Sequence, residues 1–178
     1  MKEFKHFGVY GIIIENDNII LVKKNGGPYD GKFDLPGGSI EFGETPLEAL
    51  KRELNEEIGI ELKECELLDA DSVKFNWEYN GEILKWHHIG MFYKVLSYDN
   101  VIKESVEIDS QNNDSYGASI CNVNNLKKDS LSKIAILELE KIGIKLLWRI
   151  LVVIQENPTV AWKPLKTKGK SMNLKSKA

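Results

Sequence analysis

One segment, residues 38–60, constrains the fold more than any other part of the chain, because a glycine-containing loop leads there into a well-marked helix. Thr45 and Glu48 form a Thr-x-x-Glu capping box, and the proline after the threonine fits the first helical position. Gly59 stands where a left-handed residue commonly ends a helix. The apolar residues that should pack against the protein recur at helical spacing: Leu47, Leu50, Leu54 and Ile58. These signals predict a helix over about residues 46–58.

An acidic arc lies beside the apolar one, because Glu53, Glu56 and Glu57 are three and four residues apart. Like charges at this spacing repel each other. A divalent cation reverses the sign of that interaction, since carboxylate oxygens are preferred ligands of magnesium, manganese and calcium. The alternative is a solvated acidic face balanced by Lys51 and Arg52.

The residues around the acidic arc favour the metal-binding interpretation. Gly37 and Gly38 let a backbone approach a ligand closely. Glu44 precedes the helix, and Arg52 lies beside the acids, where it can anchor the loop by a bidentate contact with a carboxylate. The segment therefore predicts a site for cations and phosphate.

The segment has the form G-x5-E-x7-R-E-L-x-E-E-x-G-I, which resembles the Nudix box of the Nudix hydrolases at every defining position. The flanking runs GVYGIII, IILVKK and FDLPGG also resemble that family. The resemblance implies an α/β (α+β) fold, a Nudix-like α/β/α sandwich with a mixed sheet. It also implies hydrolysis of a nucleoside diphosphate linked to another group.

The same resemblance implies roles for single residues. Arg52 and Glu44 would hold the loop and helix in position, and Glu53 is our candidate for the general base. Mg²⁺ is the implied cofactor, with Mn²⁺ as an alternative. Its implied ligands are three side chains, one of them direct or water-bridged (Glu56), and one backbone carbonyl: Gly37, Glu53, Glu56 and Glu57. Acidic residues outside the box are further candidates for the base or a ligand: Glu104, Glu107, Asp109 and Asp114.

Substrate contacts are expected beside the glycine-containing loop, where Gly38 leaves room for a ligand. Lys23 and Lys24 end a predicted strand, where a phosphate can sit; the alternative is charge that protects a strand edge. Tyr29 and Phe33 flank the loop and can stack on a base, although aromatic residues more often fill a core. The adjacent histidines at positions 87 and 88 point to opposite faces of a strand, so packing is expected for them rather than chelation of one ion.

The remaining chain predicts further strands and helices around this segment. Strands with alternating or β-branched residues are expected near residues 7–15, 19–25, 61–76, 82–97 and 102–108, the first two forming a hairpin. One or two helices are expected between residues 131 and 156, with Gly143 as a break. We expect one Nudix domain over residues 1–157 and a basic tail over residues 158–178.

Composition limits the class of protein. A chain of 178 residues with 42% hydrophobic content can bury one full core. Its net charge of −3 argues against nucleic acid as a partner. Cys65 and Cys121 lack metal-binding spacing and are expected to be reduced thiols, and the N-terminus lacks the apolar core of a signal peptide, so a cytoplasmic location is expected. The apolar run from Ile142 to Ile154 is too short to span a bilayer and is expected to form a helix that faces the core or a partner subunit of a homodimer.

The sequence thus predicts a magnesium-dependent hydrolase that cleaves a phosphoanhydride in a nucleoside triphosphate or a small nucleotide conjugate. A non-catalytic Nudix-like module that senses a nucleotide is the alternative. Isomerase chemistry on a prenyl diphosphate is disfavoured, because it calls for a cysteine near the loop and neither Cys65 nor Cys121 is close to it in sequence.

Overall fold

The computed structural model describes residues 2–103 and 115–147. Several predictions concern residues outside these ranges: the four acidic candidates between residues 104 and 114, most of the strand expected at residues 102–108, and the basic tail. The polar run DSQNND at residues 109–114, which is typical of an exposed loop, also lies outside them. The boundary expected at residue 157 therefore stays a prediction.

The described chain forms two four-stranded sheets. The first has the order β5–β1–β7–β6, with bounds Gly37–Ser39, Glu3–Ile12, Glu82–Asp99 and Glu61–Tyr79. Strands β1 and β7 are parallel and the other pairs are antiparallel, so this sheet is mixed. In the second sheet, β3 pairs with the three others; the bounds of β2, β3, β4 and β8 are Ile14–Glu15, Asn18–Lys24, Phe33–Asp34 and Ser115–Asn122.

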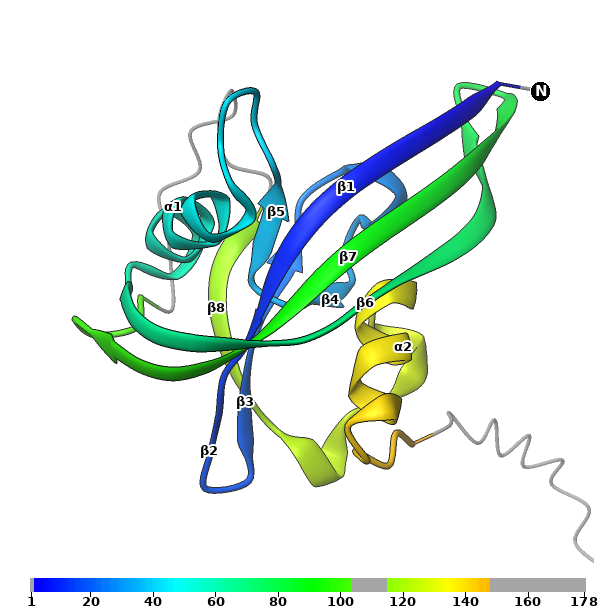
Figure 1. The fold of residues 1–178 in the computed structure, drawn as a ribbon. Coiled ribbons are helices and arrows are strands. Elements are labelled where there is room, and N and C mark those ends of the chain that lie inside the picture. Colours follow the sequence, from blue (N-terminus) through cyan, green and yellow to red (C-terminus); the bar gives the residue numbers. More distant parts are fainter. Residues whose placement is uncertain (1, 104–114, 148–178) are drawn as a thin grey trace, which may run out of the picture.

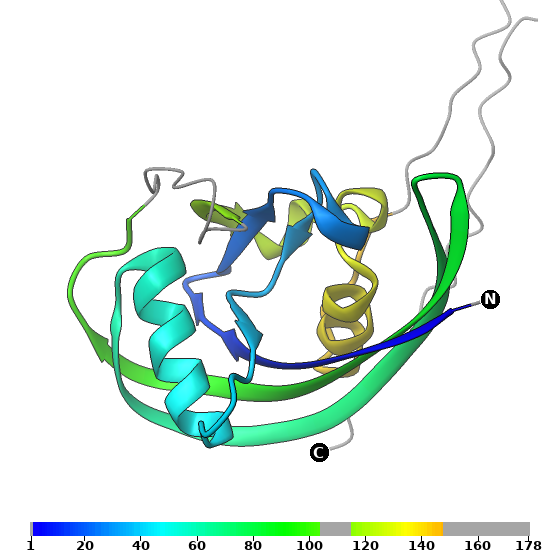
Figure 2. The same ribbon diagram turned by 90° about the horizontal axis from the view of Figure 1, so that it is seen from above.

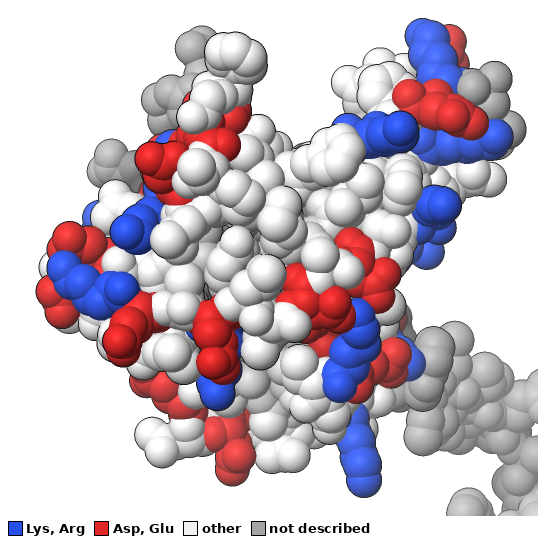
Figure 3. All heavy atoms as spheres, in the orientation of Figure 1, with Lys and Arg blue, Asp and Glu red and all other residues white. Residues whose placement is uncertain are grey.

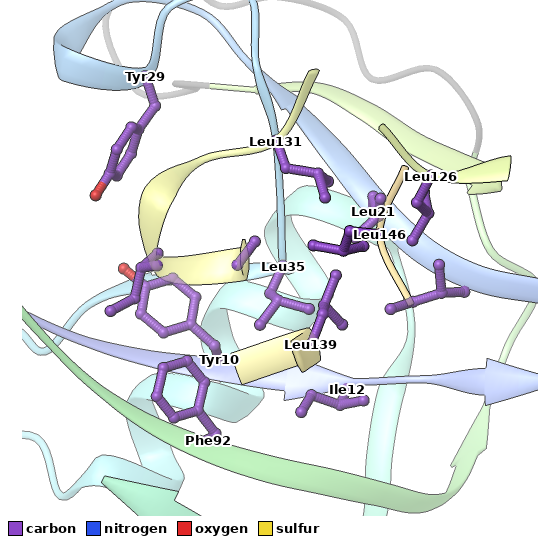
Figure 4. Packing of buried hydrophobic residues seen from close by; sticks show 13 residues of the cluster. Tyr10, Ile12, Leu21, Tyr29, Leu35, Phe92, Leu126, Leu131, Leu139 and Leu146 are labelled. Carbon is purple, nitrogen blue, oxygen red and sulfur yellow. The ribbon is translucent and has the colours of Figure 1, made fainter. Parts of the chain in front are cut away.

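Two α-helices cover the central strands from opposite sides: α1 (Pro46–Ile58) and α2 (Lys133–Lys141) (Figures 1 and 2). Alternate residues of a strand point to opposite faces, so Val9 and Ile20 pack in the α1 core, whereas Tyr10 and Ile19 pack in the α2 core. Figure 4 shows the α2 core, with Leu35 and Leu139 near the centre of the cluster. This layering confirms the expected α/β/α architecture with a mixed sheet.

Helix α1 begins and ends where the sequence predicts. The Thr45 hydroxyl accepts the Glu48 N–H at 3.3 Å, and the Glu48 carboxylate accepts the Thr45 N–H at 2.9 Å. Gly59 ends the helix with a φ of 75°. The expected apolar arc is wrong at one position, because Leu47 lies in the first turn, at the edge of the core, and is 41% exposed, whereas Ala49 is fully buried.

The first expected hairpin is also partly wrong. Residues Asn16 and Asp17 have positive φ values of 48° and 64°, but the turn they form joins only the short β2 to β3. Strand β1 instead leaves this pairing and runs beside β7, to which it is bonded from residue 3 to residue 12. The strands expected near residues 61–76 and 82–97 are confirmed as β6 and β7, which form a hairpin with its turn at Asn80 and Gly81.

The C-terminal prediction is confirmed for one helix and for the break at Gly143, and it is wrong for the residues directly after the break. Helix α2 ends before Gly143, whose φ is 91°, and residues 144–147 are not helical. Leu147 instead bridges to Lys127 and is 45% exposed. The rest of the run to Ile154 lies outside the described residues, so its role in a homodimer stays a prediction.

Acidic and basic side chains alternate over the face seen in Figure 3 rather than forming a continuous basic strip. Lys141, for example, contacts both Asp69 and Asp71. Neither α-helix in the described part of the chain has the length and apolar character needed to cross a membrane.

Candidate active site

Arg52 connects helix α1 to the loop before it. Its Nε and Nη2 donate to the two carboxylate oxygens of Glu44 at 2.7 and 2.9 Å, and Nη2 also donates to the Ser39 carbonyl at 3.0 Å. The hydrogen bond from Arg52 lowers the pKa of Glu44 to about 2. Arg52 Nη1 reaches toward the acidic arc and contacts Glu53 at 2.9 Å and Glu56 at 3.3 Å. The loop and the acids are thus held by one guanidinium group.

Glu57 is buried, with 2% of its surface exposed, and both of its oxygens have partners. Oε1 lies 3.3 Å from Lys24 Nζ, and Oε2 accepts the Gly37 N–H at 2.8 Å. Lys24 comes from β3 and Gly37 from β5, so this carboxylate joins three elements. A charged carboxylate is buried at low cost only when an ion pair and hydrogen bonds of this kind compensate for the lost water.

The two glycines of the loop are required by close packing. A Cβ on Gly37 would lie 2.1 Å from the Val9 carbonyl oxygen, and the φ of Gly37 is 138°. A Cβ on Gly38 would lie 2.6 Å from Glu53 Oε1. The absent side chains therefore let the backbone and the Glu53 carboxylate approach each other.

The donor set fits a hard divalent cation, because Glu53, Glu56 and Glu57 supply oxygen ligands on adjacent turns of one helix. The negative charges of these carboxylates are already paired with Arg52 and Lys24, however. Over residues 2–103 and 115–147, no three carboxylates, imidazoles or thiols are gathered closely enough to hold an ion as they stand. The expected convergence of all three glutamates therefore requires side-chain movement, in which Arg52 or Lys24 exchanges its carboxylate partner.

A cavity of about 440 Å³ opens beside the acidic arc. Its first end is polar and is lined by Gly37, Gly38, Ser39, Glu41, Arg52, Glu53 and Glu56. Its second end is mainly aromatic and imidazole in character and is lined by His6, Tyr10, Tyr29, Trp86 and His88. Lys24, Asp34 and the loop from Asn25 to Pro28 complete the walls. The volume lies in the range of small-molecule sites.

A buried hydrogen-bonded group forms the floor of the second end. The Tyr10 hydroxyl lies 2.6 Å from His88 Nε2, and the Tyr29 hydroxyl lies 3.1 Å from His88 Nδ1. Burial, together with His6 and Lys24, lowers the pKa of His88 to about 3, so the imidazole is neutral near pH 7. A neutral ring has one N–H, so His88 accepts from one tyrosine and donates to the other.

Tyr10 lies where the two ends of the cavity meet. Burial raises the pKa of its hydroxyl, and the nearby carboxylates of Asp34, Glu57 and Glu53 raise it further. Asp34 is itself buried and accepts hydrogen bonds from the Leu35 N–H at 2.8 Å and the Ser132 hydroxyl at 2.7 Å. The floor of the cavity is therefore close enough to Glu53 and Glu57 for their charges to act on Tyr10. Asp34, in the cavity wall, is hydrogen-bonded to Ser132 at the start of α2.

The structure brings most of the predicted site residues together. Those that line the cavity are Lys24, Tyr29, Gly37, Gly38, Arg52, Glu53 and Glu56; Glu44 and Glu57 contact members of this set. Lys23 and Phe33 do not line it. Lys23 is exposed, because its neighbour Lys24 takes the inward position, and Phe33 packs against the α2 core.

The cavity is also lined by residues that were not among the predicted site residues, including His6, Tyr10, Asp34, Trp86 and His88. The expected packing role of His88 is confirmed, since it is 2% exposed, but its position in the cavity wall is new. Alternation along β1 places His6 and Tyr10 on one face, which was a readable signal. Their proximity to β7 was not readable, because it depends on a parallel pairing between distant segments.

Two curated relatives each match a part of the chain. An ADP-ribose pyrophosphatase from Methanocaldococcus jannaschii is 47% identical over 64 residues, covering 36% of this chain and 38% of the relative. An 8-oxo-dGTP diphosphatase from Proteus vulgaris is 39% identical over 70 residues, covering 39% of this chain and 62% of the relative. The match thus spans less than two thirds of the length of either relative.

The fold is shared with a crystal structure of a MutT NUDIX hydrolase from Burkholderia pseudomallei. The TM-score is 0.61 at 24% sequence identity, and the match covers 78% of this chain and 98% of that one. The family model for the NUDIX domain matches residues 5–132, which is most of the chain. The resemblance seen in the sequence is therefore confirmed, and the chain belongs to the NUDIX domain family.

Proposed function

We propose that the protein is a magnesium-dependent hydrolase that cleaves a phosphoanhydride bond in a nucleoside diphosphate linked to another group. Membership of the NUDIX family supports hydrolysis of such anhydrides. The two curated relatives are named for ADP-ribose and for 8-oxo-dGTP, and both compounds contain this linkage. A nucleoside triphosphate or a small nucleotide conjugate is the proposed substrate, and a cytosolic location is part of the proposal.

The observation that carries the proposal is the polar end of the cavity. Glu53 and Glu56 line it, and a guanidinium group joins them to the glycine-containing loop. Mg²⁺, for which Mn²⁺ can substitute, would supply charge neutralisation on the phosphates and a lower pKa for the attacking water. The proposed ligands are Glu53, Glu56, Glu57 and the Gly37 carbonyl.

The proposed roles of the other residues follow from their contacts. Glu53 removes a proton from the attacking water, since it lines the cavity and is 13% exposed at its side chain. Arg52 and Glu44 hold the loop against the helix, so that substrate and carboxylates keep a fixed relative position. Lys24 also lines the cavity and can exchange Glu57 for a phosphate oxygen.

One observation favours the alternative, a module that binds a nucleotide without cleaving it. Both oxygens of Glu57 are engaged, one by Lys24 and one by the Gly37 N–H, so this carboxylate is not presented to a cation as it stands. In a sensing module this ion pair would persist when the nucleotide binds. In the hydrolase it would open.

The deciding experiment incubates the full chain with nucleoside triphosphates, ADP-ribose, dinucleoside polyphosphates and nucleotide sugars, with and without magnesium. The hydrolase predicts a nucleoside monophosphate and a phosphorylated remainder, or pyrophosphate from a triphosphate, resolved by chromatography. Binding without product for every compound would instead establish the sensing module.

A further inference from the structure

The aromatic end of the cavity has no role in the chemistry proposed above, which takes place at the acidic end. Two of its rings, His6 and Trp86, lie beside each other on the first sheet, and the ring of Phe4, which does not line the cavity, lies next to Trp86. The rings of Phe4 and Trp86 have centroids 6.1 Å apart and an interplanar angle of 18°. Those of His6 and Trp86 are 6.3 Å apart at 24°. Nearly parallel neighbouring rings on a sheet present a flat aromatic surface.

A glycine on β1 leaves room for the Tyr10 ring beside this surface. Gly8 pairs with Gly90 of β7, two residues along from the partners His6 and His88. A Cβ on Gly8 would lie 2.4 Å from the Tyr10 hydroxyl oxygen, so the Tyr10 ring lies over the glycine. In this orientation the hydroxyl lies 2.6 Å from His88 Nε2, and Tyr10 forms part of the cavity floor.

Within residues 2–103 and 115–147, Trp86 makes no hydrogen bond through its indole N–H that would explain why a tryptophan stands at this position. Its indole N–H is buried and has no hydrogen-bond partner in the part of the chain that the structure describes. A buried donor without a partner costs about 1–3 kcal/mol of stability. Proteins retain such costs mainly at functional sites. The ring of Trp86 also lines the cavity, where it can contact a ligand.

Two further features fit a nucleotide across the whole cavity. Lys24 lies between the two ends, since it pairs with Glu57 and also lowers the pKa of His88. Pro28 and Tyr29 line the same cavity from the loop after β3. A ligand with phosphate at one end and a flat heteroaromatic ring at the other would match both ends.

We propose that the nucleobase of the substrate binds at this aromatic end and stacks on Trp86 and His6. The inference rests on the proposed function, because it orients the substrate with its phosphates toward Glu53 and Arg52. Trp86 and His6 are then residues that bind the base, and Gly8 and Tyr10 are positioning residues. Stacking tolerates different bases, so the expected class is nucleosides in general rather than one base.

The test is equilibrium binding of AMP, GMP, CMP, UMP and base-free ribose 5-phosphate to the full chain, measured by calorimetry without metal. Ribose 5-phosphate should bind at least about 10-fold more weakly than the best nucleotide, and Trp86→Leu should weaken nucleotide binding by about 5- to 150-fold. His6→Ala should act in the same direction. The matched control His87→Ala lies on the other face of β7 and should leave affinity unchanged.

Thermal melting of each variant shows whether it is folded, and Trp86→Phe, which keeps a ring, should restore part of the affinity lost in Trp86→Leu. Equal binding of ribose 5-phosphate and the nucleotides, no saturable nucleotide binding at millimolar concentration, or unchanged affinity in folded Trp86→Leu would overturn the inference. Binding that depends on Trp86 but without hydrolysis of any compound would overturn the proposed function alone. Hydrolysis of a nucleotide together with unchanged nucleotide affinity in folded Trp86→Leu would overturn the inference alone.

Discussion

Single residues in this protein act mainly by what they allow other groups to do. Gly37 and Gly38 have no catalytic group, but Gly37 lets its backbone lie against the Val9 carbonyl while its N–H binds Glu57, and Gly38 leaves room for the Glu53 carboxylate. Lys24 differs from its neighbour Lys23 only in which side of β3 it faces, yet only Lys24 reaches the cavity.

Replacing Glu57 with glutamine tests the most buried of the acidic residues. The amide can still accept the Gly37 N–H, but the charge that pairs with Lys24 is lost. We expect hydrolysis to fall by about 100-fold, the usual effect of losing one group that stabilises charge in a transition state. The control Glu56→Gln changes a side chain that is 56% exposed and should have a smaller effect. Full magnesium-dependent turnover in folded Glu57→Gln would show that this carboxylate is not a ligand.

Adding one methyl group at position 8 should move Tyr10. The Cβ of Gly8→Ala would lie 2.4 Å from the tyrosine oxygen, so the ring must leave His88. We expect a loss of about 1–3 kcal/mol in the free energy of unfolding, as for other overpacked sites, measured by urea denaturation. In a Tyr10→Ala background the same change should cost much less, because the clash is gone. An equal loss of unfolding free energy in the wild-type and Tyr10→Ala backgrounds would show that Gly8→Ala does not act through Tyr10.

At the level of elements, the site is a junction between helix α1 and the loop that precedes it. The capping box and Gly59 determine the ends of the helix locally. Arg52 then joins the helix to residues 39–44 through Glu44 and the Ser39 carbonyl, so the loop has little independent movement. The acidic arc and the loop therefore behave as one unit.

Substitution of Arg52 should separate the loop from the helix. Arg52→Ala removes both bonds to Glu44, and we expect kcat to fall by about 10- to 100-fold because the substrate is less well positioned. Arg52→Lys keeps the charge but lacks the planar fork, so it should restore little. Steady-state kinetics and a melting curve measure both effects. Unchanged kinetics and an unchanged melting curve in Arg52→Ala would refute the anchoring role.

For the whole molecule, buried polar side chains connect strands of both sheets with the loop after β3 and with the start of α2. His88 from β7, Tyr10 from β1 and Tyr29 from the loop after β3 are joined by hydrogen bonds, and Asp34 connects β4 to Ser132 at the start of α2. The stability of the fold therefore depends on the protonation of groups at its centre.

Stability should fall in mild acid because of His88. Its pKa is about 3 in the folded protein and near 6.5 when unfolded, so between these values the unfolded chain binds more protons. This contribution is present above pH 6.5 and is lost as the pH falls toward 3, with a slope of at most about 1.4 kcal/mol per pH unit. Urea denaturation across this range should show the slope.

The control His88→Gln removes the titrating group and should lower the slope by up to about 1.4 kcal/mol per pH unit, which corresponds to one proton. Stability curves of the wild type and of His88→Gln that run parallel to each other would refute the role of His88.

Glu138 affects stability in the opposite direction, because burial raises the pKa of this carboxyl and favours its protonated form in the folded protein. Its contribution to stability is present below the unfolded pKa and is lost as the pH rises through the folded pKa.

The sequence by itself determined the features that depend on neighbouring residues. The bounds of α1, its capping box and the strands that form β6 and β7 follow from helical spacing and residue type, and all are confirmed. Family membership followed from the same short segment. Local interactions of this kind are encoded within a few turns of chain, so they can be read without a fold.

Only the tertiary structure decided which distant residues share the cavity. The parallel pairing of β1 with β7 brings His88 to Tyr10, 78 positions apart, and the packing of β3 beside α1 gives Glu57 its contact with Lys24. Shifting a strand by one residue reverses every side chain, so the choice of Lys24 over Lys23 depends on register. Register follows from burial on both faces of the sheets, which is a property of the whole fold and not of any single segment.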